Sequence, residues 1–119
     1  MSSTMLCVAV DCTSPGRLAD FWSQALNYTA RHELPNGAHL IAKDQQTTPW
    51  LAFIPVPEAK GAKNRLHLDL RPDDQEAEIE RLLALGATRA DVGQPTDAPW
   101  TVLADPEGNE FCVLPSQPA

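Results

Sequence analysis

The order of the predicted elements repeats once along the chain, and this repeat constrains the fold more than any single motif. Each half reads as a strand, a helix and then three strands, with matching positions about 60 residues apart. Residues 26–29 (Leu-Asn-Tyr-Thr) match residues 85–88 (Leu-Gly-Ala-Thr). Repetition at a fixed period favours two copies of one supersecondary unit. We therefore predict an α+β fold of two βαβββ modules, about residues 5–57 and 64–116, in a single domain over residues 1–119.

The first predicted helix has both a start signal and a stop signal. Pro15 suits the first helical turn, where its missing N–H costs nothing, and apolar residues then recur along one helix face. Asn27 follows as a residue that tolerates the left-handed conformation of a helix end. This pattern predicts a helix over residues 15–26.

The second predicted helix is framed by acidic residues and a glycine. Asp73 and Glu76 have the spacing of an N-cap residue and its N3 partner in a capping box. Gly86 stands where a glycine commonly ends a helix. This pattern predicts a helix over residues 74–85.

Short apolar or alternating runs predict the strands. In the first half they cover residues 6–12, 28–34, 39–43 and 50–56. In the second half they cover residues 66–71, 87–92, 100–104 and 110–114. Between the last two runs, the sequence of residues 105–108 (Asp-Pro-Glu-Gly) predicts a tight turn.

Composition places the chain among ordinary folded domains and disfavours two classes of partner. The chain has 119 residues, of which 43% are hydrophobic and 21% charged, as in a single soluble domain. The formal net charge of −7 argues against nucleic acid and anionic membrane surfaces as the main partners. Three cysteines without CxxC spacing, and a start without a secretory signal, favour the cytoplasm. A chain this small buries a limited core, so we also expect a homodimer.

Three segments resemble motifs of a known family. The first predicted helix, with Phe21-Trp22 and Leu26-Asn27, resembles the FYxxxLG signature of the vicinal oxygen chelate superfamily. Residues 64–70 and 104–111 are similar to two motifs of the small glyoxalase-like group within it. The resemblance spans residues 6–114. It implies that the two modules form a cupped, barrel-like mixed sheet with the helices outside and the site in the cup.

Strand alternation predicts which side chains face that cup. In residues 66–71 the three leucines share one face and should pack under the helices. The residues between and after them face the cup, and these are His67, Asp69 and Arg71. In the first strand the cup-facing residues are Cys7, Ala9 and Asp11, while Leu6, Val8 and Val10 face the helices. In the last strand Glu110, Cys112 and Leu114 share one face.

The resemblance also implies where a metal would bind. Metal-using members take ligands from the first and last strands of each module, which here correspond to Cys7, residues 49–51, His67 and Glu110. His67 and Glu110 are common ligand types and Cys7 is a soft one, but residues 49–51 offer no ligating side chain. From this incomplete set we expect either no cofactor or a weakly bound divalent metal (Zn, Ni, Mn or Fe). The alternative is that Cys7 is a small buried hydrophobe and that His67 and Glu110 make ordinary hydrogen bonds.

Two tryptophans are candidates for ligand binding. Trp50 and Trp100 lie at matching places near strand starts, where they would either stack on a flat ligand or pack at a module edge. The predicted cavity is lined by Cys7, Trp50, His67, Trp100 and Glu110. Its polar wall is predicted to hold Asp11, Asp69 and Arg71, with Arg71 paired to the two aspartates. We therefore do not expect a strongly anionic ligand.

Two classes of function remain open. The first is a small-molecule-binding protein that sequesters a drug or metabolite in the cup, as the bleomycin-binding members of the family imply. The second is a metal-dependent enzyme of the lyase, isomerase or ring-cleaving dioxygenase type, with His67 as a ligand and Glu110 as a ligand or base. The first module lacks the histidine or carboxylate that such an enzyme needs. This favours the binding protein.

Overall fold

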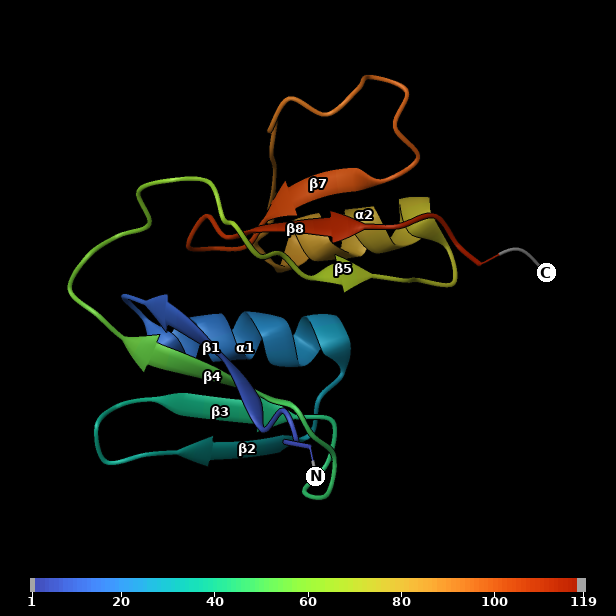
Figure 1. The fold of residues 1–119 in the computed structure, drawn as a ribbon. Coiled ribbons are helices and arrows are strands. Elements are labelled where there is room, and N and C mark those ends of the chain that lie inside the picture. The colour runs from blue at the N-terminus through green and yellow to red at the C-terminus, as the bar shows by residue number, and fades with distance from the viewer. Residues whose placement is uncertain (1, 118–119) are drawn as a thin grey trace. The chain divides into compact units, whose positions relative to one another are not determined.

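The structure, a computed structural model, describes residues 2–117 and consists of two compact units, Met1–Ala59 and Lys60–Ala119. Each unit contains a strand, a helix and three further strands, in that order (Figure 1). The predicted α+β fold of two βαβββ modules is thus confirmed. Among the described residues, no helix is long and apolar enough to cross a membrane.

The first unit is a four-stranded mixed sheet with one helix. Its sheet has the strand order β1-β4-β3-β2, in which β1 and β4 are parallel and the other pairs antiparallel. Figure 1 shows α1 behind β1 and β4. The elements of this unit are β1 (Cys7–Cys12), α1 (Pro15–Leu26), β2 (Ala30–Glu33), β3 (His39–Ala42) and β4 (Trp50–Pro55).

Helix α1 begins and ends where the sequence predicts. Its apolar face buries Leu18, Phe21 and Trp22, and the two aromatic rings meet edge to face with their centroids 5.1 Å apart. Asn27 ends the helix in the left-handed conformation, with φ 55° and ψ 46°. An asparagine tolerates this conformation better than most residues because its short polar side chain can bond locally.

Strand β1 alternates as predicted. Val8 and Val10 are half-buried on the face toward the core, whereas Cys7, Ala9 and Asp11 are exposed. The prediction that Leu6 also faces the core is wrong, because this side chain is 67% exposed. Leu6 precedes the strand, and only its backbone carbonyl joins the sheet, by accepting a bond from the Trp50 N–H.

The second unit repeats this topology with shorter outer strands. Its sheet has the order β5-β8-β7-β6, in which β5 and β8 are parallel and the other pairs are antiparallel. The parallel pair joins residues 43 positions apart in both units, as Cys7 with Trp50 and Asp69 with Cys112 show. The elements of this unit are β5 (Asp69–Leu70), α2 (Gln75–Leu85), β6 (Thr88–Arg89), β7 (Thr101–Ala104) and β8 (Glu110–Val113).

Strand β5 is much shorter than the predicted strand over residues 66–71. Leu66 is 86% exposed, so the prediction that it packs under the helix is wrong. The cause lies in the preceding loop, where Asn64 donates from its backbone N–H to the Glu110 carboxylate and from its amide group to the Glu110 carbonyl. These bonds hold the loop against the start of β8, where strand pairing would otherwise continue. Backbone pairing with β8 begins only at Leu68, whose carbonyl accepts a bond from the Cys112 N–H.

The predicted capping box of α2 does not form. The N-cap is Asp74, not Asp73, and its side chain accepts a hydrogen bond of 3.1 Å from the Ala77 N–H. Asp74 has the extended conformation, with φ −138° and ψ 110°, that an N-cap requires. The other end agrees with the prediction, since Gly86 ends the helix with φ 123°.

The turn between β7 and β8 is organised by a buried carboxylate. Asp105, which is 3% exposed, accepts hydrogen bonds from the backbone N–H groups of Glu107 and Asn109 and from the Asn109 side chain. The Gly108 N–H donates to the Asp105 carbonyl, and Gly108 has φ 89°, as the predicted tight turn requires.

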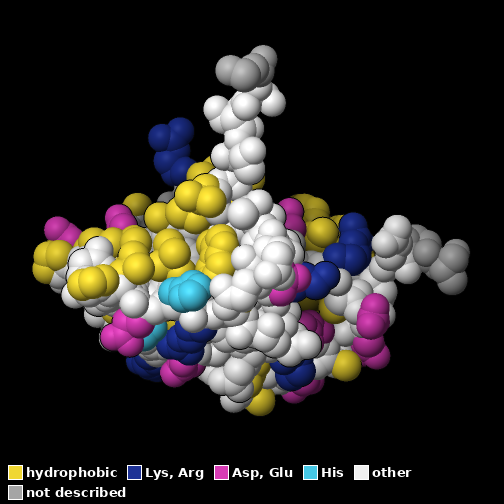
Figure 2. All heavy atoms as spheres, turned by 90° about the horizontal axis from the view of Figure 1, so that it is seen from below, with side chains coloured by type: hydrophobic (Ala, Val, Ile, Leu, Met, Phe, Trp, Pro, Cys, Tyr) yellow, Lys and Arg dark blue, Asp and Glu magenta, His cyan; other side chains and the backbone are white. Residues whose placement is uncertain are grey.

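The surface carries both signs of charge despite the acidic total. On the face in Figure 2, basic and acidic side chains are interspersed, and hydrophobic side chains gather in one area beside a histidine. Among the described residues, the exposed large hydrophobic side chains are Met5, Leu6, Leu34, Leu66 and Trp100.

Candidate functional site

The second unit contains a pocket of about 230 Å³. Its apolar wall includes Val92, Trp100 and Val102, and its polar wall includes His67 and Glu110. Three residues predicted for the site, His67, Trp100 and Glu110, therefore lie around one pocket. Trp100 is 36% exposed, so part of its surface is open to solvent.

The strands and one loop position these side chains. Glu110 and Cys112 are two positions apart on β8 and both line the pocket, together with Phe111 between them. The loop before β7 supplies Val92 and Gln94. This loop is held by its own bonds, because the Val92 N–H donates to the Gln94 side chain at 2.9 Å and the Gln94 amide donates to the Ala90 carbonyl at 3.2 Å.

Both carboxylate oxygens of Glu110 are engaged. Oε1 accepts the Asn64 backbone N–H at 3.0 Å, and Oε2 forms an ion pair with the Lys60 Nζ, also at 3.0 Å. Burial by itself would raise the pKa of Glu110, but the bonds from Asn64 and Lys60 outweigh it and hold the pKa below its usual range. Glu110 is thus an ionised carboxylate whose charge is balanced by Lys60 and which is a weak base.

The metal set that the resemblance implies does not fit these contacts. A metal on Glu110 would have to displace the Lys60 ammonium or lie beside it, and two cations at that distance repel each other. The third implied ligand, Cys7, is an exposed thiol of the first unit. The residues present therefore do not fit a metal on Glu110.

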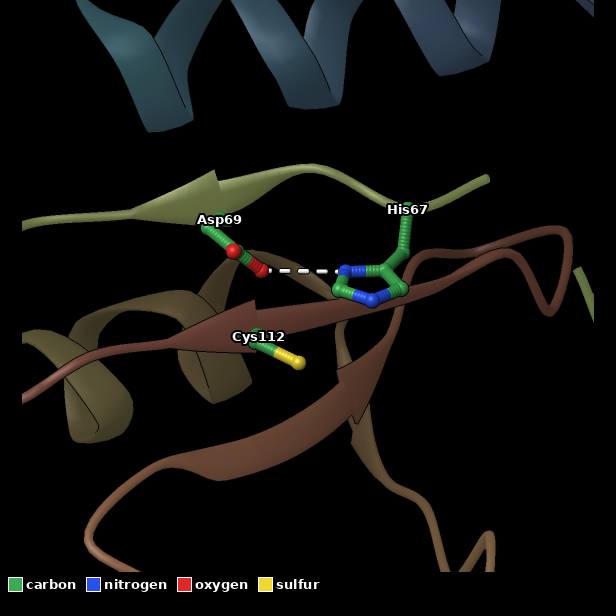
Figure 3. Close-up of side chains that lie close together, drawn as sticks. All are labelled: His67, Asp69 and Cys112. Atoms are coloured by element: carbon green, nitrogen blue, oxygen red, sulfur yellow. Dashed lines mark ion pairs between the residues drawn. The ribbon is translucent and has the colours of Figure 1, made fainter. Parts of the chain in front are cut away.

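A different group of potential ligands lies beside the pocket. His67 Nδ1 and Asp69 Oδ1 are 2.9 Å apart, and Cys112 lies on the neighbouring strand (Figure 3). Ligand atoms of these three side chains all lie within 4.8 Å of one another. Burial, followed by the charge of Asp69 and a hydrogen bond to it, raises the pKa of the Cys112 thiol.

Arg71 does not make the predicted pair with Asp69. Its guanidinium donates to the Pro115 carbonyl at 2.6 Å, whereas Asp69 is paired with His67. Since β5 ends at Leu70, Arg71 lies beyond the strand that would have fixed its direction. The predicted polar wall of the pocket thus lacks the Arg71–Asp69 pair.

The other predicted site residues belong to the first unit. Cys7 and Asp11 are exposed on β1. Trp50 is half-buried at the start of β4, and its ring centroid lies 5.2 Å from that of His32, whose Nε2 contacts Gln45 at 3.0 Å. The structure thus places Trp50 against a histidine. The single cavity shared with second-unit residues stays a prediction.

The sequence reasoning missed Lys60, Lys63 and Gln94. Lys63 and Gln94 line the pocket, and Lys60 holds Glu110. Asn64 opens one of the motifs that carry the resemblance, but its bonds to Glu110 are not visible in a single sequence. No local pattern signals Lys60, because it contacts a residue 50 positions away.

The two βαβββ units place the chain in the class of glyoxalase-like proteins. Residues 7–114 match the family of the glyoxalase-like domain, so the chain belongs to that family, within the vicinal oxygen chelate superfamily. Comparison with curated proteins gives no significant match.

Solved structures of the superfamily share the fold. A glyoxalase/bleomycin resistance protein/dioxygenase family enzyme from Burkholderia phytofirmans PsJN has a TM-score of 0.68 at 19% identity, covering 93% of this chain and 97% of its own. A fosfomycin resistance protein from Listeria monocytogenes, complexed with Mn(II) and a dihydroxypropylphosphonic acid, has 0.70 at 10% identity, covering 98% and 92%. TnmS3, an antibiotic-binding protein from Streptomyces sp. CB03234, has 0.62 at 18% identity, covering 98% of both chains. Such similarity supports the fold and leaves the activity to the site itself.

Proposed function

We propose that this chain binds a small, mainly apolar molecule with a planar ring, in the pocket of the second unit. The ligand would be held without chemistry at Glu110. The observation that carries this proposal is the double engagement of that carboxylate by Asn64 and Lys60. A general base must accept a proton near neutral pH, and a carboxylate whose two oxygens both accept bonds and whose pKa is lowered is poorly suited to that role. A metal on Glu110 would have to compete with the Lys60 ammonium.

The pocket wall supports an apolar ligand with few polar contacts. Trp100, Val92 and Val102 offer aromatic and aliphatic surface, while His67 and Gln94 are the polar groups that would orient the ligand. Because Trp100 lines the pocket and is partly exposed, its ring is suited to stacking on another ring. The volume of about 230 Å³ limits this pocket to a ligand, or part of one, that is smaller than a typical drug molecule.

Relatives with the same fold include both binding proteins and enzymes. TnmS3 is described as an antibiotic-binding protein, whereas the Listeria protein was determined with Mn(II) and a phosphonic acid. The fold therefore accommodates either class of function. The contacts of Glu110 favour the binding class for this chain.

Replacement of Trp100 by alanine tests the proposal. The probe is 2-naphthol, a small, neutral and planar aromatic molecule, titrated against the full chain and followed by its fluorescence. We expect saturable binding by the wild type and a rise in Kd of about tenfold or more in Trp100→Ala, because the stacking surface is lost. Trp100→Phe should retain most of the affinity.

Leu66→Ala is the matched control, because Leu66 is an exposed hydrophobic residue of the same unit that does not line the pocket. Its Kd should equal that of the wild type. Equal loss of affinity in Trp100→Ala and Leu66→Ala, or no saturable binding, would refute the proposed pocket. Conversion of a probe in the presence of added metal, abolished in Glu110→Gln, would instead favour the metal-dependent enzyme.

We also propose that the protein is a cytoplasmic homodimer. Its three cysteines are free thiols, which suits a reducing compartment. Met5 and Leu6 are each more than half exposed, and pairing of two chains is a common way to cover such side chains. Static light scattering at tens of micromolar protein checks the pairing, and a mass near 13.0 kDa would contradict it.

A further inference from the structure

His67, Asp69 and Cys112 are brought together by the backbone. His67 precedes β5 by two positions, and its side chain meets that of Asp69, with His67 Nδ1 and Asp69 Oδ1 2.9 Å apart. Cys112 is the register partner of Asp69 in the parallel pair of β5 and β8, and neighbouring strands lie close together on one face. Figure 3 shows Asp69 on β5, Cys112 on β8 and His67 on the segment that leads into β5, with the three side chains close together. Two of the three residues, Asp69 and Cys112, are therefore positioned by strand pairing.

The three donors suit a borderline-soft divalent ion. The group offers an imidazole nitrogen, a carboxylate oxygen and a sulfur, which together favour Zn²⁺ over Mg²⁺ or Ca²⁺. Zinc bonds of about 2.0–2.3 Å place tetrahedral ligand atoms roughly 3.3–3.8 Å apart. In the structure the three ligand atoms lie up to 4.8 Å apart. To bind one zinc ion they would have to approach one another by roughly 1 Å, which side-chain rotation can supply.

Burial divides the group into one fixed donor and two adjustable ones. Cys112 is buried, whereas the side chains of His67 and Asp69 are 42% and 48% exposed. The direct contact of 2.9 Å between His67 and Asp69 shows that these two already approach each other closely. Cys112 would anchor the ion, and the other two side chains would close around it.

The charges around the group are mixed. The Asp69 carboxylate, paired with His67, supplies the negative charge, and Lys60 is engaged by Glu110. The charge of Lys63 acts on Cys112, so the exposed Lys63 side chain, which donates to the Asn64 carbonyl at 3.3 Å, would have to turn away from a bound ion. Because His67 and Cys112 line the pocket, an ion bound by the group would border it.

We propose that His67, Asp69 and Cys112 form a divalent metal site, with Zn²⁺ as the preferred ion. Binding would replace the Cys112 S–H bond by a sulfur–metal bond and release the proton to solvent, with no oxidation or reduction. This site differs from the Glu110 set that the resemblance implies. It also goes beyond the proposed ligand binding, which does not require it.

Titration of the metal-free full chain with Co²⁺, which substitutes for Zn²⁺ and absorbs light, tests the site. We expect a near-ultraviolet thiolate-to-cobalt charge-transfer band that saturates at one ion per chain and disappears when Zn²⁺ is added. Cys112→Ser should abolish the band. His67→Ala and Asp69→Asn should each weaken binding by more than about tenfold, since even indirect partners of a metal contribute that much.

Cys7→Ser is the matched control, because it removes the exposed thiol of the other unit and should leave the titration unchanged. Absence of the band in the wild type would overturn the proposal. The proposal would also fail if Cys7→Ser or Glu110→Gln lost the band while Asp69→Asn kept it. A measurement on the wild type avoids any folding defect of Cys112→Ser. In it, Zn²⁺ binding should release about one proton per ion from the Cys112 thiol, as read by a pH indicator in weakly buffered solution, and binding without proton release would also count against the site.

Discussion

Replacement of Leu82 by alanine is expected to lower the free energy of unfolding by about 2–5 kcal/mol. Leu82 lies on the buried face of α2 and is 0% exposed. Removing its methyl groups loses burial and leaves a cavity that a small unit can refill only in part. Urea denaturation of the full chain, followed by circular dichroism, measures the change. A loss of this size is a large fraction of the stability of an ordinary domain.

Leu66→Ala is the control for this prediction, because it makes the same chemical change in the same unit at an 86% exposed side chain. We expect it to change the free energy of unfolding by no more than about 0.5 kcal/mol. If the two variants lose equal stability, the placement of Leu66 outside the core is wrong. The sequence prediction of a longer strand would then be restored.

Replacement of Asp105 by alanine is expected to cost about 3 kcal/mol of unfolding free energy. Asp105 is buried, and its carboxylate accepts bonds from two backbone N–H groups, those of Glu107 and Asn109, and from the Asn109 amide. Alanine would leave these donors without their acceptor in a site that water reaches poorly. Asp105→Asn, which keeps one acceptor oxygen, should lose less. The measurement is again denaturation of the full chain.

Asp44→Ala is the matched control for the turn. The Asp44 carboxylate also organises a turn, by accepting bonds from the Gln46 N–H at 2.9 Å and the Thr47 hydroxyl at 2.7 Å. These groups lie at the surface, so water replaces the lost acceptor and the destabilisation should be much smaller. Similar losses in Asp44→Ala and Asp105→Ala would show that burial of the Asp105 carboxylate is unimportant.

Much of the fold could be predicted from local patterns. The periodic apolar face of residues 15–26 and the following Asn27 predict α1 with its observed bounds. Strand lengths in the second unit could not be predicted, because they depend on pairing between distant segments. Residues 66–71 alternate strictly, yet only Asp69–Leu70 form β5, since the Asn64 bonds hold the preceding loop against Glu110.

The candidate site was predictable only in part. Alternation along the last strand places Glu110 and Cys112 on one face, and both line the pocket. The contacts that set the chemistry of Glu110 are not local, because Lys60 lies 50 positions away in the chain. Periodicity identifies which face a side chain occupies, but it carries no information on which distant partner neutralises it.

The equal spacing of the two parallel pairs has a consequence for the entropy of the chain. In each unit, pairing of the first strand with the last closes a loop of 43 positions, so the entropic cost of closure is similar. The first unit offsets this cost with six paired residues in β1, whereas β5 contributes only two. The edge formed by β5 should therefore open more readily than the edge formed by β1. An ion shared by Asp69 and Cys112 would clamp the weaker edge, because these two residues are the ends of its loop.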